Sequence, residues 1–196
     1  MRKLILSMNL SLDGCMASAD QQLDWHLRCW TSEMGDELCR QLATADTILL
    51  GRKTFSVMAA YWPMQNGVSH CRAEDFAYAQ MMNSYQKIVF SRTLRIPAWH
   101  NALLYRDSPA TVVQQLKQRP GKNMIVYGSC QLAETLVQAG LVDEYQLWIH
   151  PIVLGGGKKL FTQLPYTSAL QLLGTRQFST GVVTLYYAPG PAHMFH

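Results

Sequence analysis

The sequence has little charge and no long apolar run, and each shortage excludes a class of protein. Charged residues make up 15% of the 196 residues and hydrophobic residues 48%, which is typical of a globular chain and not of a disordered one. The formal net charge is only +4, and the basic residues are scattered, so no nucleic-acid-binding face is indicated. No apolar stretch approaches the roughly 20 residues that span a bilayer. We therefore expect a globular protein that binds neither nucleic acid nor membrane.

Paired cysteines and a signal peptide are also missing. The five cysteines contain no C-x-x-C pair, and their odd number argues against a closed disulfide framework. The N-terminal segment reaches Ser7, Asn9 and Asp13 too early for the apolar run of a signal peptide. These observations predict a cytoplasmic protein.

Several motifs of catalysis and metal binding are absent or incomplete. No G-x-G-x-x-G, H-E-x-x-H or Cys/His cluster occurs. Ser129 is not part of G-x-S-x-G, because Tyr127 stands at the first glycine position. Residues 155–158 resemble part of a P-loop, but Ile152 stands where its first glycine belongs. The six histidines are dispersed and are expected on the surface or in loops, so no metal site is predicted.

Short apolar segments alternate with segments of helical spacing. The expected strands are 3–9, 47–50, 87–90, 102–105, 123–127 and 142–150, and the expected helices are 33–44, one that follows 51–54 and ends before Pro63, 73–85, 111–118 and 129–139. Segments 170–178 and 182–188 flank Thr180-Gly181 and predict a terminal β-hairpin. This order predicts one three-layer α/β/α domain over residues 1–190, with a mostly parallel sheet, an antiparallel edge and a frayed tail at 191–196.

Three of the expected strands end in small, hydroxyl-bearing or basic residues. These strand exits are residues 51–54, 91–93 and 128–131. Ligands of open α/β sheets bind beyond the carboxyl ends of the strands, where helix N-termini offer free N–H groups to anions. Glycine lets the backbone approach such a ligand, and arginine pairs with phosphate oxygens. One exit alone could be a simple turn, but three in one small domain predict a nucleotide-binding site.

Five short motifs follow one another along the chain. They are SLDG at 11–14, LLGRKTF at 49–55, VFSRTL at 89–94, YGS at 127–129, and the pair VDE and PIVLGGG between 142 and 157. In this order the chain resembles the C-terminal domains of bacterial deaminase-reductases, over nearly its whole length. These are the dihydrofolate-reductase-like reductases of riboflavin biosynthesis and their stand-alone relatives. The zinc deaminase half of those proteins, with its H-x-E and P-C-x-x-C motifs, is missing here.

The resemblance implies NADPH as the cofactor. The first exit would contact its pyrophosphate and ribose, the second its adenosine 2′-phosphate, and the third its diphosphate at a helix N-terminus. The implied cofactor-binding residues are Leu50, Gly51, Arg52, Lys53, Thr54, Ser91, Arg92, Thr93, Gly128, Ser129, Cys130, Gln131 and Leu132.

The resemblance also implies substrate-binding and catalytic residues. Asn9, Asp13 and Trp25 correspond to the substrate side, with Trp25 near the nicotinamide or the substrate ring. Asp36 lies nearest the position of the carboxylate that supports proton transfer in dihydrofolate reductases. Each has a structural alternative: Trp25 as a core or lid aromatic, Asp13 as part of an Asp-Gly turn, and Asp36 as part of a solvated helix face.

The implied activity is an NADPH-dependent reduction of a small heterocyclic or ribosylamino-pyrimidine substrate. Riboflavin-pathway reductases usually carry a glutamate two residues before the glycine matched by Gly128, and this chain has Val126 there. That departure leaves two alternatives open, a dihydrofolate or pterin reductase and a non-catalytic NADPH-binding protein. By analogy with relatives of this fold, we expect the protein to form a homodimer. We expect its binding partner to be a small-molecule substrate.

Overall fold

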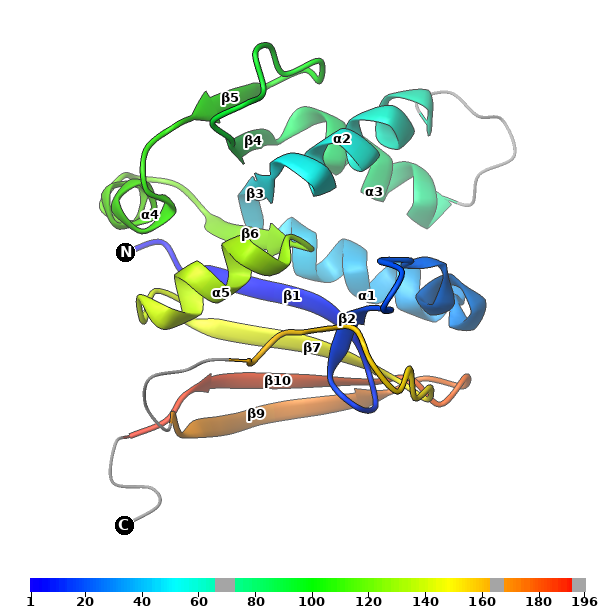
Figure 1. Cartoon of the computed structure of the whole chain (residues 1–196). Helices are drawn as coiled ribbons and strands as arrows, with labels where there is room; N and C mark the ends of the chain where they lie inside the picture. The colour runs from blue at the N-terminus through cyan, green and yellow to red at the C-terminus, as the bar shows by residue number, and fades with distance from the viewer. Residues whose placement is uncertain (66–72, 163–167, 192–196) are drawn as a thin grey trace.

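The computed structural model describes residues 1–65, 73–162 and 168–191, and its centre is an eight-stranded sheet (Figure 1). Its strands are β1 (Leu4–Ser11), β3 (Ala45–Gly51), β4 (Gln86–Phe90), β5 (Ala102–Tyr105), β6 (Asn123–Tyr127), β7 (Glu144–His150), β9 (Leu170–Gln177) and β10 (Val183–Pro189). The strand order is β5-β4-β3-β6-β1-β7-β10-β9. The first six strands of this order, from β5 at the edge to β7, are parallel to one another. Strand β10 pairs antiparallel with both β7 and β9. The predicted mostly parallel sheet with an antiparallel edge is confirmed.

Helices cover both faces of the sheet. They are α1 (Ser32–Ala43), α2 (Arg52–Tyr61), α3 (Ala73–Ser84), α4 (Pro109–Lys117) and α5 (Cys130–Gln138), with the short 3-10 helices η1 (Asp24–Cys29) and η2 (Trp62–Gln65). Val113 of α4 and Leu136 of α5 belong to one buried cluster, together with Leu6 of β1. The other face packs against α1, α2 and α3, whose contributions to a second cluster include Leu42 and Phe55. Because side chains alternate across a strand, β1, β3, β4, β5 and β6 contribute to both clusters, whereas Trp148 of β7 belongs to a third cluster with Met34, Phe178 and Val182.

A second, two-stranded sheet lies outside the strands predicted from the sequence. Strand β2 (Cys15–Ala17) pairs antiparallel with β8 (Lys158–Lys159). Helix η1 follows β2, and neither element is among those predicted from the sequence. These elements have only two to six residues each, and they are held by contacts with distant parts of the chain, which local spacing does not reveal.

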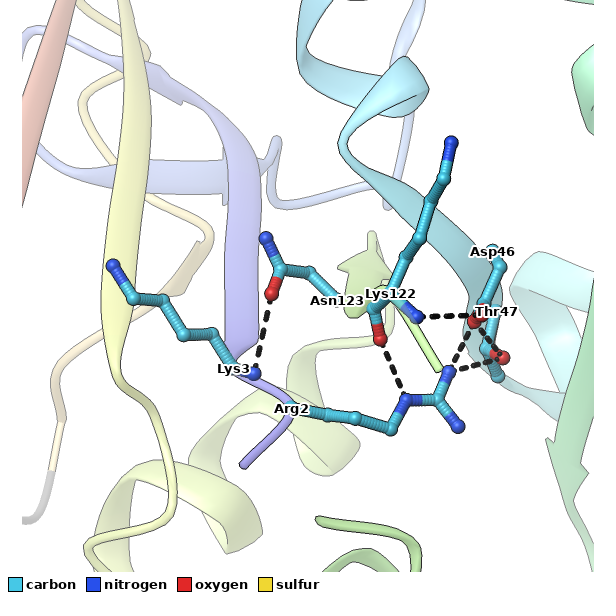
Figure 2. Close-up of polar contacts among 6 residues, drawn as sticks. All are labelled: Arg2, Lys3, Asp46, Thr47, Lys122 and Asn123. Atoms are coloured by element: carbon cyan, nitrogen blue, oxygen red, sulfur yellow. Dashed lines mark hydrogen bonds and ion pairs between the residues drawn. The ribbon is translucent and has the colours of Figure 1, made fainter. Parts of the chain in front are cut away.

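Arg2 ties the amino end of β1 to the starts of β6 and of β3, the strand beyond it (Figure 2). Its guanidinium forms an ion pair with Asp46 and donates to Thr47 Oγ1 at 2.7 Å, while its Nε donates to the backbone oxygen of Lys122 at 2.6 Å. Asp46 also accepts the backbone N–H of Lys122 at 2.8 Å. The first residues of β3 and the residue before β6 are thereby tied to the start of β1. This cluster lies at the opposite end of the parallel strands from the predicted site.

Two further sequence predictions concern the covalent state and the tail. Cys15, Cys29 and Cys130 are free thiols, and Cys71 lies outside the described residues. The tail expected to be frayed lies outside them as well, apart from Pro191. Within the described ranges, no helix has the length and apolar character needed to cross a membrane.

Candidate functional site

The side chain of Ser129 joins two of the three predicted strand exits. Its Oγ accepts the backbone N–H of Gly51 at 2.7 Å and donates to Thr54 Oγ1 at 2.8 Å. Strands β3 and β6 are neighbours in the sheet, so their carboxyl ends lie side by side. The close fit requires small residues: a Cβ on Gly51 would lie 2.7 Å from Ser129 Oγ, and a Cβ on Gly128 would lie 3.0 Å from Thr54 Cγ2.

Two helices begin at this junction with their first N–H groups available. Helix α2 starts after Gly51 and α5 starts after Ser129, and within the described residues no side chain caps either N-terminus. Ser129 occupies the left-handed backbone region (φ 60°, ψ 73°), which is unfavourable for a residue with a Cβ. That backbone conformation lets its hydroxyl reach β3 instead of capping α5. The N-terminal ends of two helix dipoles therefore meet at one place, which favours an anion.

The third exit lies beyond β4 and forms a separate shallow pocket. Ser91 Oγ accepts the backbone N–H groups of Thr93 and Leu94 at 3.2 and 2.9 Å, which shapes a tight turn. The Arg106 guanidinium supports this turn by donating to the backbone oxygen of Arg92 at 2.7 Å. The pocket has a volume of about 210 Å³ and is lined by Phe90, Ser91, Arg92, Tyr105, Arg106, Asp107, Ser108 and Pro109. The Arg92 side chain is exposed, and it makes no ion pair within the part of the chain that is described.

The remaining predicted cofactor residues differ in what they offer. Leu50 and Leu132 are buried in the core, so only their backbone atoms could contact a ligand. Arg52 is exposed at the first turn of α2, and Lys53 Nζ donates to Gln21 Oε1 at 3.3 Å. Cys130 and Gln131 form the first turn of α5 and present backbone N–H groups there.

On the predicted substrate side, Trp25 lies against two histidines. His150 ends β7 and is 1% exposed, and its Nε2 donates to Asn9 Oδ1 at 2.9 Å. The Trp25 ring is 5.3 Å from the His150 ring and 5.6 Å from the His26 ring, measured between centroids, and both pairs are T-shaped. The structure therefore brings Asn9 and Trp25 together around His150, at the carboxyl ends of β1 and β7.

Burial keeps the two imidazoles neutral. Desolvation, together with the nearby imidazole of His26, lowers the pKa of His150 to about 4. Desolvation also lowers the pKa of His26, against opposing contributions from the backbone of Leu23 and the charge of Asp24. At neutral pH His150 therefore holds one ring proton, which lies on the Nε2 that donates to Asn9, and its Nδ1 is a bare acceptor.

This shift predicts that stability depends on pH in a defined window. An unfolded histidine has a pKa near 6.5, so the unfolded chain takes up a proton below that pH while folded His150 stays neutral down to about pH 4. We expect the free energy of unfolding to fall by about 2 kcal/mol between pH 7 and pH 5 because of His150. Urea unfolding at several pH values measures this effect. A His150→Asn variant should lose most of this slope, and an unchanged slope would contradict the assignment.

The Asp13 carboxylate binds backbone groups of a distant loop. Oδ1 accepts from Ser11 Oγ at 2.6 Å and from the backbone N–H of Leu154 at 3.1 Å, and Oδ2 accepts from the backbone N–H of Gly155 at 3.0 Å. These hydrogen bonds lower the pKa of Asp13 to about 2, with the Ser11 hydroxyl as the largest cause. The side chain is thus engaged in joining two loops, which corresponds to the structural alternative for this residue.

Helix α1 exposes Asp36 and buries Glu37. The Glu37 side chain is 8% exposed and pairs with Arg176 of β9 and, at 2.8 Å, with Arg40. It also accepts the hydroxyl of Tyr186 in β10 at 2.5 Å. Asp36 points to the surface and is not brought to the cluster around His150, so its catalytic role stays a prediction without geometric support.

The sequence interpretation missed His26 and His150. Both were expected on the surface or in loops, but His150 is buried and His26 is half-buried beside it. The sequence did contain a sign that His150 belongs to a site, because this residue lies at the end of an expected strand. The three predicted exits lie at the ends of expected strands as well. His26 is adjacent to a selected residue, Trp25, but a lone histidine in a polar segment carries no local signal. Among the described residues, no group of three histidine, cysteine or acidic side chains could hold a metal ion.

The chain matches the model of the RibD C-terminal domain over residues 2–184 and therefore belongs to that family. It is similar to the uncharacterized protein YyaP of Bacillus subtilis, with 36% identity over 187 residues, which cover 95% of this chain and 94% of the relative. Its fold is similar to that of a candidate riboflavin biosynthesis protein from Shewanella sp. PV-4, with a TM-score of 0.73 and 18% identity over 96% of this chain and 99% of the other.

A second solved structure with a similar fold is that of a longer protein. The diaminohydroxyphosphoribosylaminopyrimidine deaminase/5-amino-6-(5-phosphoribosylamino)uracil reductase of Thermotoga maritima matches with a TM-score of 0.66 and 14% identity. The match covers 96% of this chain and 57% of that protein. The expected α/β fold related to these proteins is confirmed.

Proposed function

We propose that this protein is an NADPH-dependent reductase that acts on a small heterocyclic substrate. The observation that carries the proposal is the junction at Ser129, where two helix N-termini that no described side chain caps meet at neighbouring strand ends. A diphosphate fits this junction because it offers one anionic group to each helix. The family, and the reductase activity that the Thermotoga maritima protein is named for, support the choice of a reduced nicotinamide cofactor.

The pocket at Arg92 supports NADPH over NADH. It lies beyond β4, which is the strand next to β3, so one extended ligand could reach from the Ser129 junction to this pocket. The exposed guanidinium of Arg92 could pair with a terminal phosphate, and the Arg106 guanidinium adds positive charge behind it. NADH lacks the 2′-phosphate and would leave this pocket without an anion.

The test is a fluorescence titration of the protein with NADPH and with NADH. We expect NADPH to bind more tightly, and an Arg92→Ala variant to bind NADPH about 10- to 100-fold more weakly, because one charged hydrogen-bonding pair is lost. Arg95→Ala is the matched control, since Arg95 is also exposed but lies outside the pocket, and it should bind NADPH like the natural protein. If neither nucleotide binds, the proposed function is wrong.

The proposed substrate class includes more than ribosylamino-pyrimidines, because Val126 stands where riboflavin-pathway reductases usually carry a glutamate. This side chain is fully buried in the cluster covered by α4 and α5, and no carboxylate stands at the position where the riboflavin-pathway reductases usually carry one. A ribosylamino-pyrimidine is the first substrate to test and a pterin the second. The same observation favours one rival, a protein that binds NADPH without catalysis. Oxidation of NADPH in the presence of either substrate would exclude that rival.

A further inference from the structure

Three side chains at the carboxyl ends of β1 and β7 carry polar ring atoms without partners. These atoms are Trp25 Nε1, His26 Nδ1 and His150 Nδ1, each buried and without a hydrogen bond to any of the described residues. A buried polar atom that makes no hydrogen bond costs about 1–3 kcal/mol. Because the three rings contact one another, these unpartnered atoms belong to a single cluster.

The cluster offers a defined set of hydrogen-bonding groups. The indole of Trp25 can only donate, while the bare Nδ1 of His150 can only accept, since its proton lies on the Nε2 that donates to Asn9. Among the described residues, no carboxylate shifts the pKa of His150, and Asp24, whose side chain is exposed, is the one acid that acts on His26. A charged ligand would find no opposite charge here. The matching ligand is a neutral ring with an N–H donor and a carbonyl acceptor.

Helix η1 covers the cluster, in which Trp25 is 5% and His150 1% exposed. Trp25 is the only buried residue of this six-residue 3-10 helix, and within the described chain no side chain caps its start. Leu27 is 60% exposed, whereas Cys29 packs against the cluster of Met34, Trp148, Phe178 and Val182, and its backbone oxygen accepts the Thr180 hydroxyl at 3.1 Å. A planar ring bound between η1 and the strand ends would therefore have to displace the ring contacts of Trp25 and His26 while η1 stays held at Cys29.

We propose that Trp25, His26 and His150 form the recognition site for an uncharged planar heterocycle, whose ring N–H donates to His150. Its carbonyl accepts the indole N–H of Trp25, and His26 closes over the ring from η1. The assignment of this ligand as the substrate rests on the proposed reductase function. His26 and His150 are therefore residues that bind and orient the substrate beside the cofactor junction, from which they are separated by one strand, β1.

The test compares two ligands that differ in whether their ring nitrogens can donate a hydrogen bond. The probes are 6-aminouracil and 6-amino-1,3-dimethyluracil, which keeps both carbonyls but has no ring N–H. Calorimetric titration at pH 7.5 should show about tenfold tighter binding of 6-aminouracil, the effect of one hydrogen bond. In a His150→Leu variant the ratio between the two ligands should fall to near one. A ratio that persists in this variant would show that the methyl groups act by size alone and would overturn the proposal.

A second variant tests the donor without disturbing the fold. Trp25→Phe keeps an aromatic ring and removes the indole N–H, so it should weaken binding of both probes about tenfold. Its free energy of unfolding should fall only by the amount expected for the smaller ring. Trp30→Phe is the matched control, because Trp30 follows η1 and is 41% exposed. Equal binding by the natural protein and Trp25→Phe would contradict the proposal.

Nitrogen NMR of the imidazoles gives a readout that requires neither a variant nor activity. The His150 Nδ1 resonance should move upfield when 6-aminouracil is added, as expected for a bare nitrogen that accepts a hydrogen bond, and it should not move with the dimethyl derivative. No shift at saturation would overturn the proposal. Failure of NADPH to bind the natural protein tests the proposed function separately, because these titrations contain no nucleotide.

Discussion

Replacing Gly157 with alanine is expected to lower the free energy of unfolding by about 3–5 kcal/mol, the combined effect of a strained backbone and a steric overlap. A Cβ at this position would lie 2.0 Å from the backbone oxygen of Ala17. The backbone of Gly157 has φ +139°, a conformation that residues with a side chain rarely adopt. The atom in the way belongs to β2 and not to a mobile side chain. Strand β8 would therefore have to move away from β2, with loss of the pairing between them.

Gly156→Ala is the control for this prediction. A Cβ at Gly156 meets no atom within 4 Å, and its backbone needs no positive φ, so the change in stability should stay within about 0.5 kcal/mol. Urea unfolding of both variants measures the difference. Equal stability of the two variants would mean that β2 and β8 are not packed as described.

Replacing Glu37 with alanine should lower the free energy of unfolding by about 3 kcal/mol, toward the lower end of the range for broken buried ion pairs. Glu37 connects α1 with the far edge of the sheet through Arg176 and Tyr186. Without the carboxylate, Arg176 would remain charged with its side chain only 31% exposed. Partial solvation of Arg176 is the reason for expecting the lower end of the range.

Asp36→Ala is the matched control for Glu37→Ala. It removes a carboxylate from the adjacent position of the same helix, but the Asp36 side chain is exposed, so stability should change by at most about 0.5 kcal/mol. Thermal unfolding of the two variants in parallel tests the contrast. A loss in Asp36→Ala comparable to that in Glu37→Ala would refute the assignment of the buried network to Glu37.

The sequence predicted the features that are written locally. Apolar runs that end in Gly51 and Gly128 identified two strands, the helices that follow them, and the hydroxyl-bearing residues at their junction. The contact that unites them, from Ser129 to Gly51, spans 78 positions in the chain. Spacing along the chain cannot show which two exits lie side by side, because that depends on strand order.

Features that depend on tertiary contacts were missed. Strands β2 and β8 have three and two residues, too few for any alternation to be visible. His150 was set aside because it belongs to no cluster in the sequence, and its partners Trp25 and Asn9 lie more than 120 positions away. The choice between Asp36 and Glu37 also needed the structure, since only the packing of α1 against β9 and β10 decides which acid is buried.

The anchor at Arg2 has a consequence for the distant end of the molecule. Arg2 and Asn9 are seven positions apart in extended chain, or about 23 Å. In the observed register Asn9 lies beside Trp148 of β7, and Ser11 beside His150. A slip of β1 by one residue would turn each of its side chains to the opposite face of the sheet. Leu10 would then stand where Asn9 now meets His150. By fixing β1 against β3 and β6 at its start, Arg2 sets the alignment of side chains that it never touches.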